Sequence, residues 1–346
     1  MIEQIFIIKK QKFNLIFALL KIYLSFIVVN THCFDPSINK YKNLFILNLL
    51  INNLPVPIFY IISFYFCFNL FKSRNLDKIK LRFERLLIPY FLWPIIIWIL
   101  NNIFSLILKF DLRNSFNDLF EQILMGHCFM TVLWFQHDLI FCTILLLIIE
   151  LIFFNYSEYI LINLEFSAFY FQYSNYNFEL FSNYNFNKKF TYGRIAEIIP
   201  YCITGYIFAS SNIINFFKQN KAKSTNYIIL ILILFKKFDL FIDVNGFYYQ
   251  GLKLYILSSV IFIFFSLIPS NKIENKFIIS FIKIFSKHIS GIYYIHIPIM
   301  RYFENYISLI KDKTLFGSII VYIICYCICF LGNIKFGNTK LRHLFI

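Results

Sequence analysis

Long apolar runs recur along the whole of this sequence, and they limit the folds that are open to it. A helix needs about 20 apolar residues to cross the hydrocarbon core of a bilayer. Clear candidates for such helices are residues 13–34, 44–71, 86–108, 131–154, 194–217, 247–269, 284–308 and 314–334. Charged residues make up only 15% of the chain, against about 25% in a soluble domain. The chain therefore requires lipid around it, and we expect an integral membrane protein.

Two weaker runs complete the expected topology. Residues 226–242 form a shorter apolar run, and residues 156–176 are apolar and aromatic although they contain Glu165. Cytoplasmic loops of membrane proteins are enriched in lysine and arginine. With ten spans, one side of the membrane receives all the main basic clusters, which lie before residue 13, within 72–85, within 218–223 and after 334. We therefore expect an all-α bundle of about ten transmembrane helices, multi-pass, with both termini cytoplasmic.

The chain is expected to form one membrane-embedded domain over residues 1–346, with its core at about 13–335, since no repeat or Gly/Ser linker divides it. The formal net charge of +15 is assigned to loops whose cations face anionic lipid. The lipid bilayer is thus the expected partner of this charge, and nucleic acid is not. The cysteines lie mostly inside apolar runs without C-x-x-C spacing, so no metal site is expected.

Ionisable groups inside apolar runs are the first candidates for a functional site, because each is costly to bury in lipid. Lys21 and His32 stand in the first run, eleven residues apart. Eleven residues make almost three helical turns, so both side chains project from one helix face about 16 Å apart. The alternative is a lysine that extends to the membrane surface and a histidine at the interface.

A second candidate follows the second run, where Arg82 and Arg85 stand three residues apart. This spacing puts two guanidinium groups on neighbouring positions of a helix. Forked donors at a membrane surface suit a polyphosphate ligand. The alternative is an anchor that only sets topology, which explains the charge but not the spacing.

These motifs resemble those of the membrane-bound acyltransferase 3 family. Lys21-x10-His32 resembles the family's Arg/Lys-x10-His signature, and Arg82-Phe83-Glu84-Arg85 resembles its Arg-x-x-Arg signature. Further segments resemble the family in the same order, namely Pro57–Ser63, Leu133–Phe135, Pro200–Tyr206 and Gly291–His296. The resemblance covers residues 13 to about 335.

The resemblance implies a transferase that moves an acyl group, with acetyl favoured, from cytoplasmic acyl-CoA to a hydroxyl of a carbohydrate or similar acceptor. The donor's phosphates would rest on Arg82 and Arg85. His32 would be the general base or a transient acyl carrier, with Lys21 steadying negative charge or holding the donor. His296, Asp138 and Ser63 are possible cavity-lining residues. Acyl-CoA is then a co-substrate, and neither a metal nor a permanently bound cofactor is expected.

A purely structural role is the alternative at several of these positions. A core histidine bonded to a neighbouring helix is an alternative for His296, and a structural pair with His137 is favoured for Asp138. Two further pairs, Arg194–Glu197 and Arg301–Glu304, have the i, i+3 spacing of partners on one helix. The rival function is a multi-pass transporter or exporter, which would show repeated halves with broken helices at matching positions. Those features are missing from this sequence, so acyl transfer is favoured.

Overall fold

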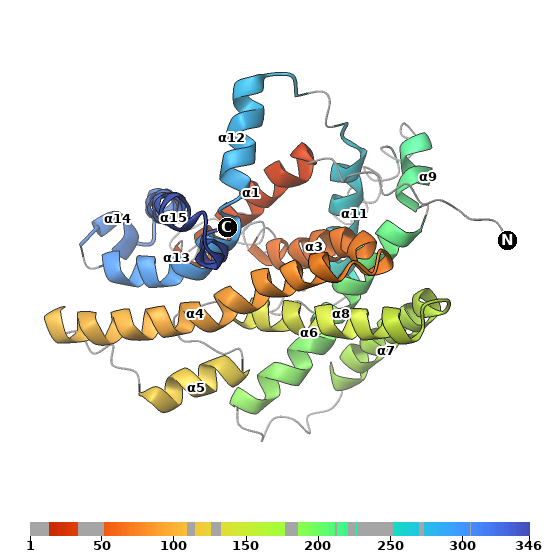
Figure 1. Cartoon of the computed structure of the whole chain (residues 1–346), viewed down its shortest axis with the longest axis horizontal. Helices are drawn as coiled ribbons and strands as arrows, with labels where there is room; N and C mark the ends of the chain where they lie inside the picture. Colours follow the sequence, from red (N-terminus) through yellow and green to blue (C-terminus); the bar gives the residue numbers. More distant parts are fainter. Residues whose placement is uncertain are drawn as a thin grey trace.

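The computed structural model describes residues 14–33, 52–108, 115–125, 133–176, 186–211, 213–220, 226, 252–269, 273–304 and 306–346. Every regular element in these ranges is a helix (Figure 1). The elements are α1 (Leu15–Cys33), α3 (Pro55–Lys72), α4 (Leu76–Leu108), α5 (Phe116–Met125), α6 (Leu133–Ile152), α7 (Ser157–Tyr176), α8 (Phe186–Ser210), α9 (Ile213–Gln219), α11 (Leu252–Leu267), α12 (Lys276–Ser286), α13 (Ile289–Phe303), α14 (Ser308–Lys311), α15 (Leu315–Phe336) and the 3₁₀ helix η4 (Lys340–Leu344). The prediction of an all-α protein is confirmed for this part of the chain.

Five of the described helices are long and apolar enough to cross a membrane, and these are α1, α3, α4, α6 and α15. A shorter apolar helix covers Leu254–Leu267 within α11. The weak run at 156–176 does form a helix, α7, but it is not one of the five. The expected span at 226–242 lies outside the described residues apart from Asn226. The count of about ten spans therefore stays a prediction, as does the cytoplasmic location of the termini.

Several boundaries differ from those expected, and one of them is the start of α3 at Pro55 within the run 44–71. α4 begins at Leu76 rather than near residue 86, so the basic segment is the first part of a 33-residue helix. The Asn75 side chain accepts a hydrogen bond from the Lys78 amide at 3.0 Å, which caps the start of the helix. The run at 194–217 is divided between α8 and α9, and the run at 284–308 between the end of α12 and α13.

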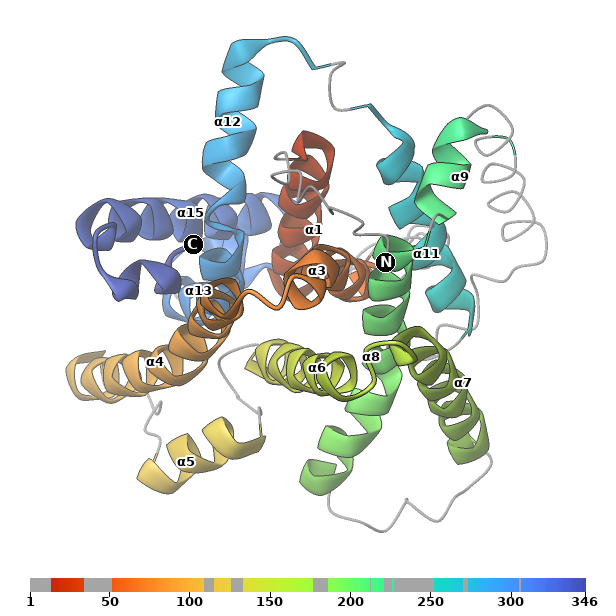
Figure 2. The same ribbon diagram turned by 45° about the vertical axis from the view of Figure 1, so that its right-hand side comes forward.

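α1 is the central helix of the described part (Figure 2), because it contacts α3 and α11 on one side and α12, α13 and α15 on the other. Its first half packs into an apolar core shared with α3, α6, α8 and α11, through Phe17, Leu20 and Leu24. Its second half packs into another core shared with α4, α13 and α15, through Val29 and Cys33. The two cores thus meet along one helix.

The most extensive helix contact joins α3 and α8. A side chain at Gly205 would overlap the backbone of Ile61, so glycine lets the two helices approach each other more closely than any other residue would allow. Tyr60, Tyr201 and Tyr206 are fully or almost fully buried along this contact. The contact fixes α3, which carries Ser63, relative to the rest of the bundle.

Candidate active site

The first half of α1 presents Lys21 to α3 and α4. Its Nζ atom lies 5.5 Å from the centre of the Phe66 ring, which is a cation–π distance. Arg82 and Cys67 are the charged or ionisable groups that act most strongly on Lys21. The structure therefore places Lys21 near Arg82, although the two residues come from different motifs and different helices.

Arg82 reaches across to α3, where its Nη2 donates a hydrogen bond to Ser63 Oγ at 2.8 Å. Its Nε atom is buried and has no hydrogen-bond partner among the described residues. Arg85 is exposed, so one arginine of the motif faces the bundle and the other lies open. Lys21, Ser63 and Arg82 form one group, which we call the basic end of the site.

The second half of α1 presents His32 to α13. The ring centres of His32 and His296 are 5.2 Å apart, so the structure brings together two histidines that lie far apart in the sequence. His32 is exposed, whereas His296 is fully buried. Arg301, also on α13, lies close enough to act electrostatically on His32. His32, His296 and Arg301 form the histidine end of the site.

The hydrogen bonds of His296 fix its tautomer. Its Nδ1 atom lies 2.8 Å from the Tyr293 carbonyl oxygen and 3.3 Å from that of Ile292. Carbonyl oxygens only accept, so Nδ1 carries the proton and Nε2 of the neutral ring has a free lone pair. That Nε2 atom is buried and has no hydrogen-bond partner in the described part of the chain. A buried acceptor without a partner is costly, and it stands beside the ring of His32.

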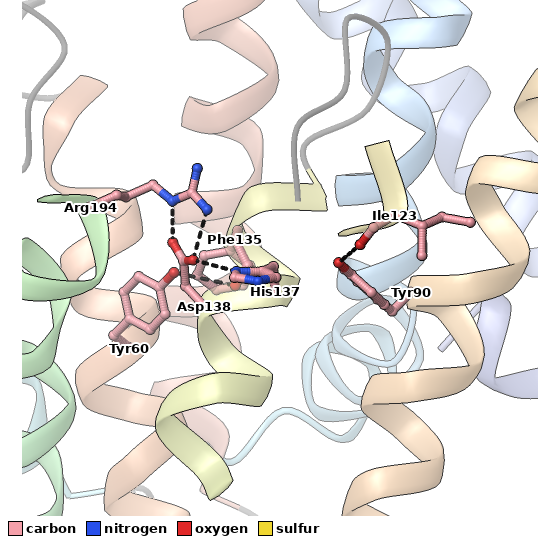
Figure 3. A network of polar contacts seen from close by, with 7 residues as sticks. All are labelled: Tyr60, Tyr90, Ile123, Phe135, His137, Asp138 and Arg194. Atoms are coloured by element: carbon pink, nitrogen blue, oxygen red, sulfur yellow. Dashed lines mark hydrogen bonds and ion pairs between the residues drawn. The ribbon is translucent and has the colours of Figure 1, made fainter. Parts of the chain in front are cut away.

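Asp138 anchors the start of α6 to α8 (Figure 3). Its carboxylate accepts two hydrogen bonds from Arg194, from Nε at 2.5 Å and from Nη2 at 2.9 Å. His137 Nδ1 lies 2.9 Å from the same carboxylate, as expected for neighbouring residues. Asp138 is fully buried and Arg194 is 4% exposed. The spacing of Arg194 and Glu197 predicted a pair within one helix, and it could not predict this partner on α6.

An aromatic row connects this ion pair with the histidines. The Arg194 guanidinium lies 5.7 Å from the Trp134 ring, and the Trp134 and Phe135 rings are 6.2 Å apart. Phe135 in turn lies 4.9 Å from Tyr293, whose ring is 5.9 Å from His296. The Tyr60 hydroxyl donates to the Phe135 carbonyl oxygen at 3.3 Å (Figure 3). Asp138 thus holds in place the residues that lead to the histidine end.

Two carboxylates within the bundle, the buried Glu150 and the half-buried Glu165, escaped the sequence analysis as site candidates. Glu150 on α6 pairs with Lys72 at 2.7 Å and accepts a hydrogen bond from the Tyr206 hydroxyl at 2.6 Å. Glu165 on α7 accepts hydrogen bonds from Tyr255 at 2.6 Å and Thr204 at 2.9 Å. A carboxylate within an apolar run is a signal that could have found both. These contacts provide each carboxylate with nearby partners, and both glutamates lie on helices other than α1.

No cluster of three or more His, Cys, Asp or Glu residues suited to a metal ion occurs in the part of the chain that the structure describes. The side chains named at the two ends of the site supply imidazole, guanidinium, ammonium and hydroxyl groups.

Comparison with models of known protein families identifies one that covers both ends of the site. The acyltransferase 3 family model, which describes an acyltransferase domain, matches residues 14–334. The chain belongs to this family. The match covers nearly the whole sequence and includes both ends of the site, while the C-terminal residues after 334 lie beyond it. Searches of curated proteins and of solved structures found no match. Family membership and the apolar helices together make the chain an acyltransferase of the membrane.

Proposed function

We propose that this protein transfers an acyl group, with acetyl as the first choice, from acyl-CoA to a hydroxyl of a carbohydrate or similar acceptor. The observation that supports the proposal is the placement of two unlike sites on one helix. The basic end has a guanidinium whose buried Nε atom has no hydrogen-bond partner among the described residues, and a neighbouring ammonium. The histidine end lies about 16 Å further along α1, by the rise of an α-helix.

The donor is assigned to the basic end. Acyl-CoA carries several phosphate charges, and guanidinium groups bind phosphate through paired hydrogen bonds. Arg82 and Arg85 would hold these phosphates, and Ser63 would keep the Arg82 side chain in position. Lys21 adds a positive charge along the face of α1 on which the donor's pantetheine arm would lie. The thioester would then reach His32.

The transfer step is assigned to His32, and two routes fit the same residue. As a general base, a ring nitrogen of His32 takes the proton from the acceptor hydroxyl while that oxygen attacks the thioester carbonyl. The C–S bond breaks, and the CoA thiolate leaves and takes up the proton. As an acyl carrier, the nitrogen itself attacks the carbonyl, and the C–S bond breaks as the CoA thiolate leaves. The acyl-imidazole then passes the acyl group to the acceptor oxygen, whose proton goes to the thiolate. Under either route His296 Nε2 would accept a hydrogen bond from His32 or from the acceptor.

The proposal includes the topology on which the geometry depends. Ten spans with both termini cytoplasmic would put Arg82 and Arg85 on the cytoplasmic side, where acyl-CoA is found, and His32 toward the opposite face. In support, Lys340 of the C-terminal segment contacts Glu84 between the two arginines at 2.9 Å. Cysteine labelling at residues 77 and 343 should therefore report the same face of the membrane, and labelling from opposite faces would overturn the ten-span topology.

The test of the reaction is transfer from labelled acetyl-CoA to a panel of carbohydrate acceptors in membranes that contain the protein. Wild type should transfer label, and His32→Ala should not. Thr31→Ala is the matched control, because Thr31 neighbours His32 and its hydroxyl donates to the Ile27 carbonyl oxygen of its own helix, at 2.9 Å. Full activity of the His32→Ala variant, in folded protein, would overturn the role of His32. Movement of the acceptor across the membrane without acylation would favour the transporter.

A further inference from the structure

The C-terminal segment of the chain turns back onto α4 after the last long helix. α15 ends at Phe336, and the residues of η4 lie along the first half of α4. Lys340 Nζ contacts Glu84 Oε1 at 2.9 Å, and Trp93 Nε1 donates to the Leu344 carbonyl oxygen at 3.1 Å. Two contacts, one at each end of η4, therefore fix this segment parallel to the stretch of α4 that contains Arg85.

The end of this segment packs against α4, α15 and the start of α13. The Phe345 carbonyl oxygen lies 2.8 Å from His288 Nδ1, and the Phe345 ring is 5.8 Å from that of Phe336 and 6.0 Å from that of Trp93. A side chain at Gly332 would overlap the Phe345 ring. Leu344 and His343 are 4% and 2% exposed. The segment is thus packed in place, although it lies outside the part that matches the family.

This packing gathers positive charge around Arg85. Arg342 lies between the two contacts, and both Arg342 and Arg85 are exposed. Arg342 and Arg82 are the charged groups that act on Arg85. Glu84 is a carboxylate near this group, and Lys340 already pairs with it. Like charges that are brought together repel one another, so an anion bound there would relieve the repulsion.

We propose that the C-terminal segment Lys340–Leu344 is part of the donor site and that Arg342 binds a phosphate of acyl-CoA together with Arg85. The inference rests on the proposed function, because that proposal supplies the identity of the anion. It adds a residue that neither the family's signatures nor the sequence analysis pointed to. Arg82 would bind on the bundle side of the same phosphates, where its Nε atom has no partner among the described residues.

The experiment measures CoA binding to the purified full chain in nanodiscs of phosphatidylcholine, which has no net negative charge to compete. Arg342→Gln should weaken CoA binding about three- to tenfold, the range of one partly exposed charge-assisted hydrogen bond. Lys311→Gln is the matched control, because it removes the same charge from an exposed residue on α14, which packs near the start of α15. It should leave CoA binding unchanged.

Two further measurements separate phosphate binding from a structural effect. Binding of acetyl-pantetheine, which has no phosphate, should be the same in wild type and Arg342→Gln. The double variant Arg85→Gln with Arg342→Gln should lose less than the sum of the single losses, because both side chains bind one ligand group. Equal CoA affinity of wild type and Arg342→Gln would overturn the inference, and so would an equal loss of acetyl-pantetheine binding. A folded wild type that binds no CoA would instead overturn the proposed donor.

Discussion

The ion pair between Asp138 and Arg194 offers the sharpest test of how the bundle holds its site. Asp138→Asn keeps the shape of the side chain but removes its charge, so the nearly buried Arg194 loses the anion that now lies 2.5 Å from its Nε atom. Removing one partner of a buried pair costs about 3–5 kcal/mol, because the other partner then loses the counter-ion that it was buried against. We expect a loss of this size in the free energy of unfolding.

The assay is reversible unfolding in mixed micelles with increasing sodium dodecyl sulfate. Asp77→Asn is the control, because Asp77 is exposed in the first turn of α4 and its charge is worth about 1 kcal/mol or less there. The double variant Asp138→Leu with Arg194→Leu should recover part of the loss, since it removes both members of the pair. An Asp138→Asn protein as stable as wild type would refute the reasoning, as would a double variant less stable than the single one.

Three other predictions concern the site and the C-terminal segment. His32→Ala should lower kcat by about 10²–10⁴-fold with little change in KM, measured with labelled acetyl-CoA, and a large KM effect with normal kcat would contradict it. Lys21→Ile combined with Ile22→Lys moves the positive charge by about 100° around α1 at constant composition, and it should abolish the contribution of Lys21 to acyl transfer. Full transfer activity in this variant would make Lys21 a passive anchor. Burial, helped by the neighbouring Arg342, lowers the pKa of His343 below 6.5. Since the packed segment then favours neutral His343, its hydrogen-exchange protection should be full above about pH 6.5 and decline below it. His343→Gln should remove that pH dependence.

Much of the helical layout could be predicted from apolar runs alone. The runs at 131–154 and 314–334 form α6 and α15, within two residues at each end. A continuous apolar stretch in lipid must satisfy its backbone hydrogen bonds internally, which favours a helix over its whole length. The start of α4 could not be placed this way. Lys78, Lys80 and Arg82 look like a cytoplasmic loop by charge, yet lysine and arginine are also good helix formers.

Contacts between side chains on different helices could not be predicted from the sequence. The spacing of Lys21 and His32 predicts a shared face of α1, but nothing in it indicates that His296 lies beside His32. In the same way, Arg194 had a plausible partner three residues away, and its contact with Asp138 depends on how α6 packs on α8. Such contacts follow from packing, which a single sequence does not encode as a local pattern.

The position of α1 in both apolar cores has a consequence for the evolution of the protein. Between Leu24 of the first core and Val29 of the second, an inserted or deleted residue would turn one half of the helix by about 100° and shift it by about 1.5 Å. One core would then lose its packing, and either Lys21 or His32 would leave its neighbours. We therefore expect relatives to vary in the identity of residues along this helix but to keep their number between the lysine and the histidine.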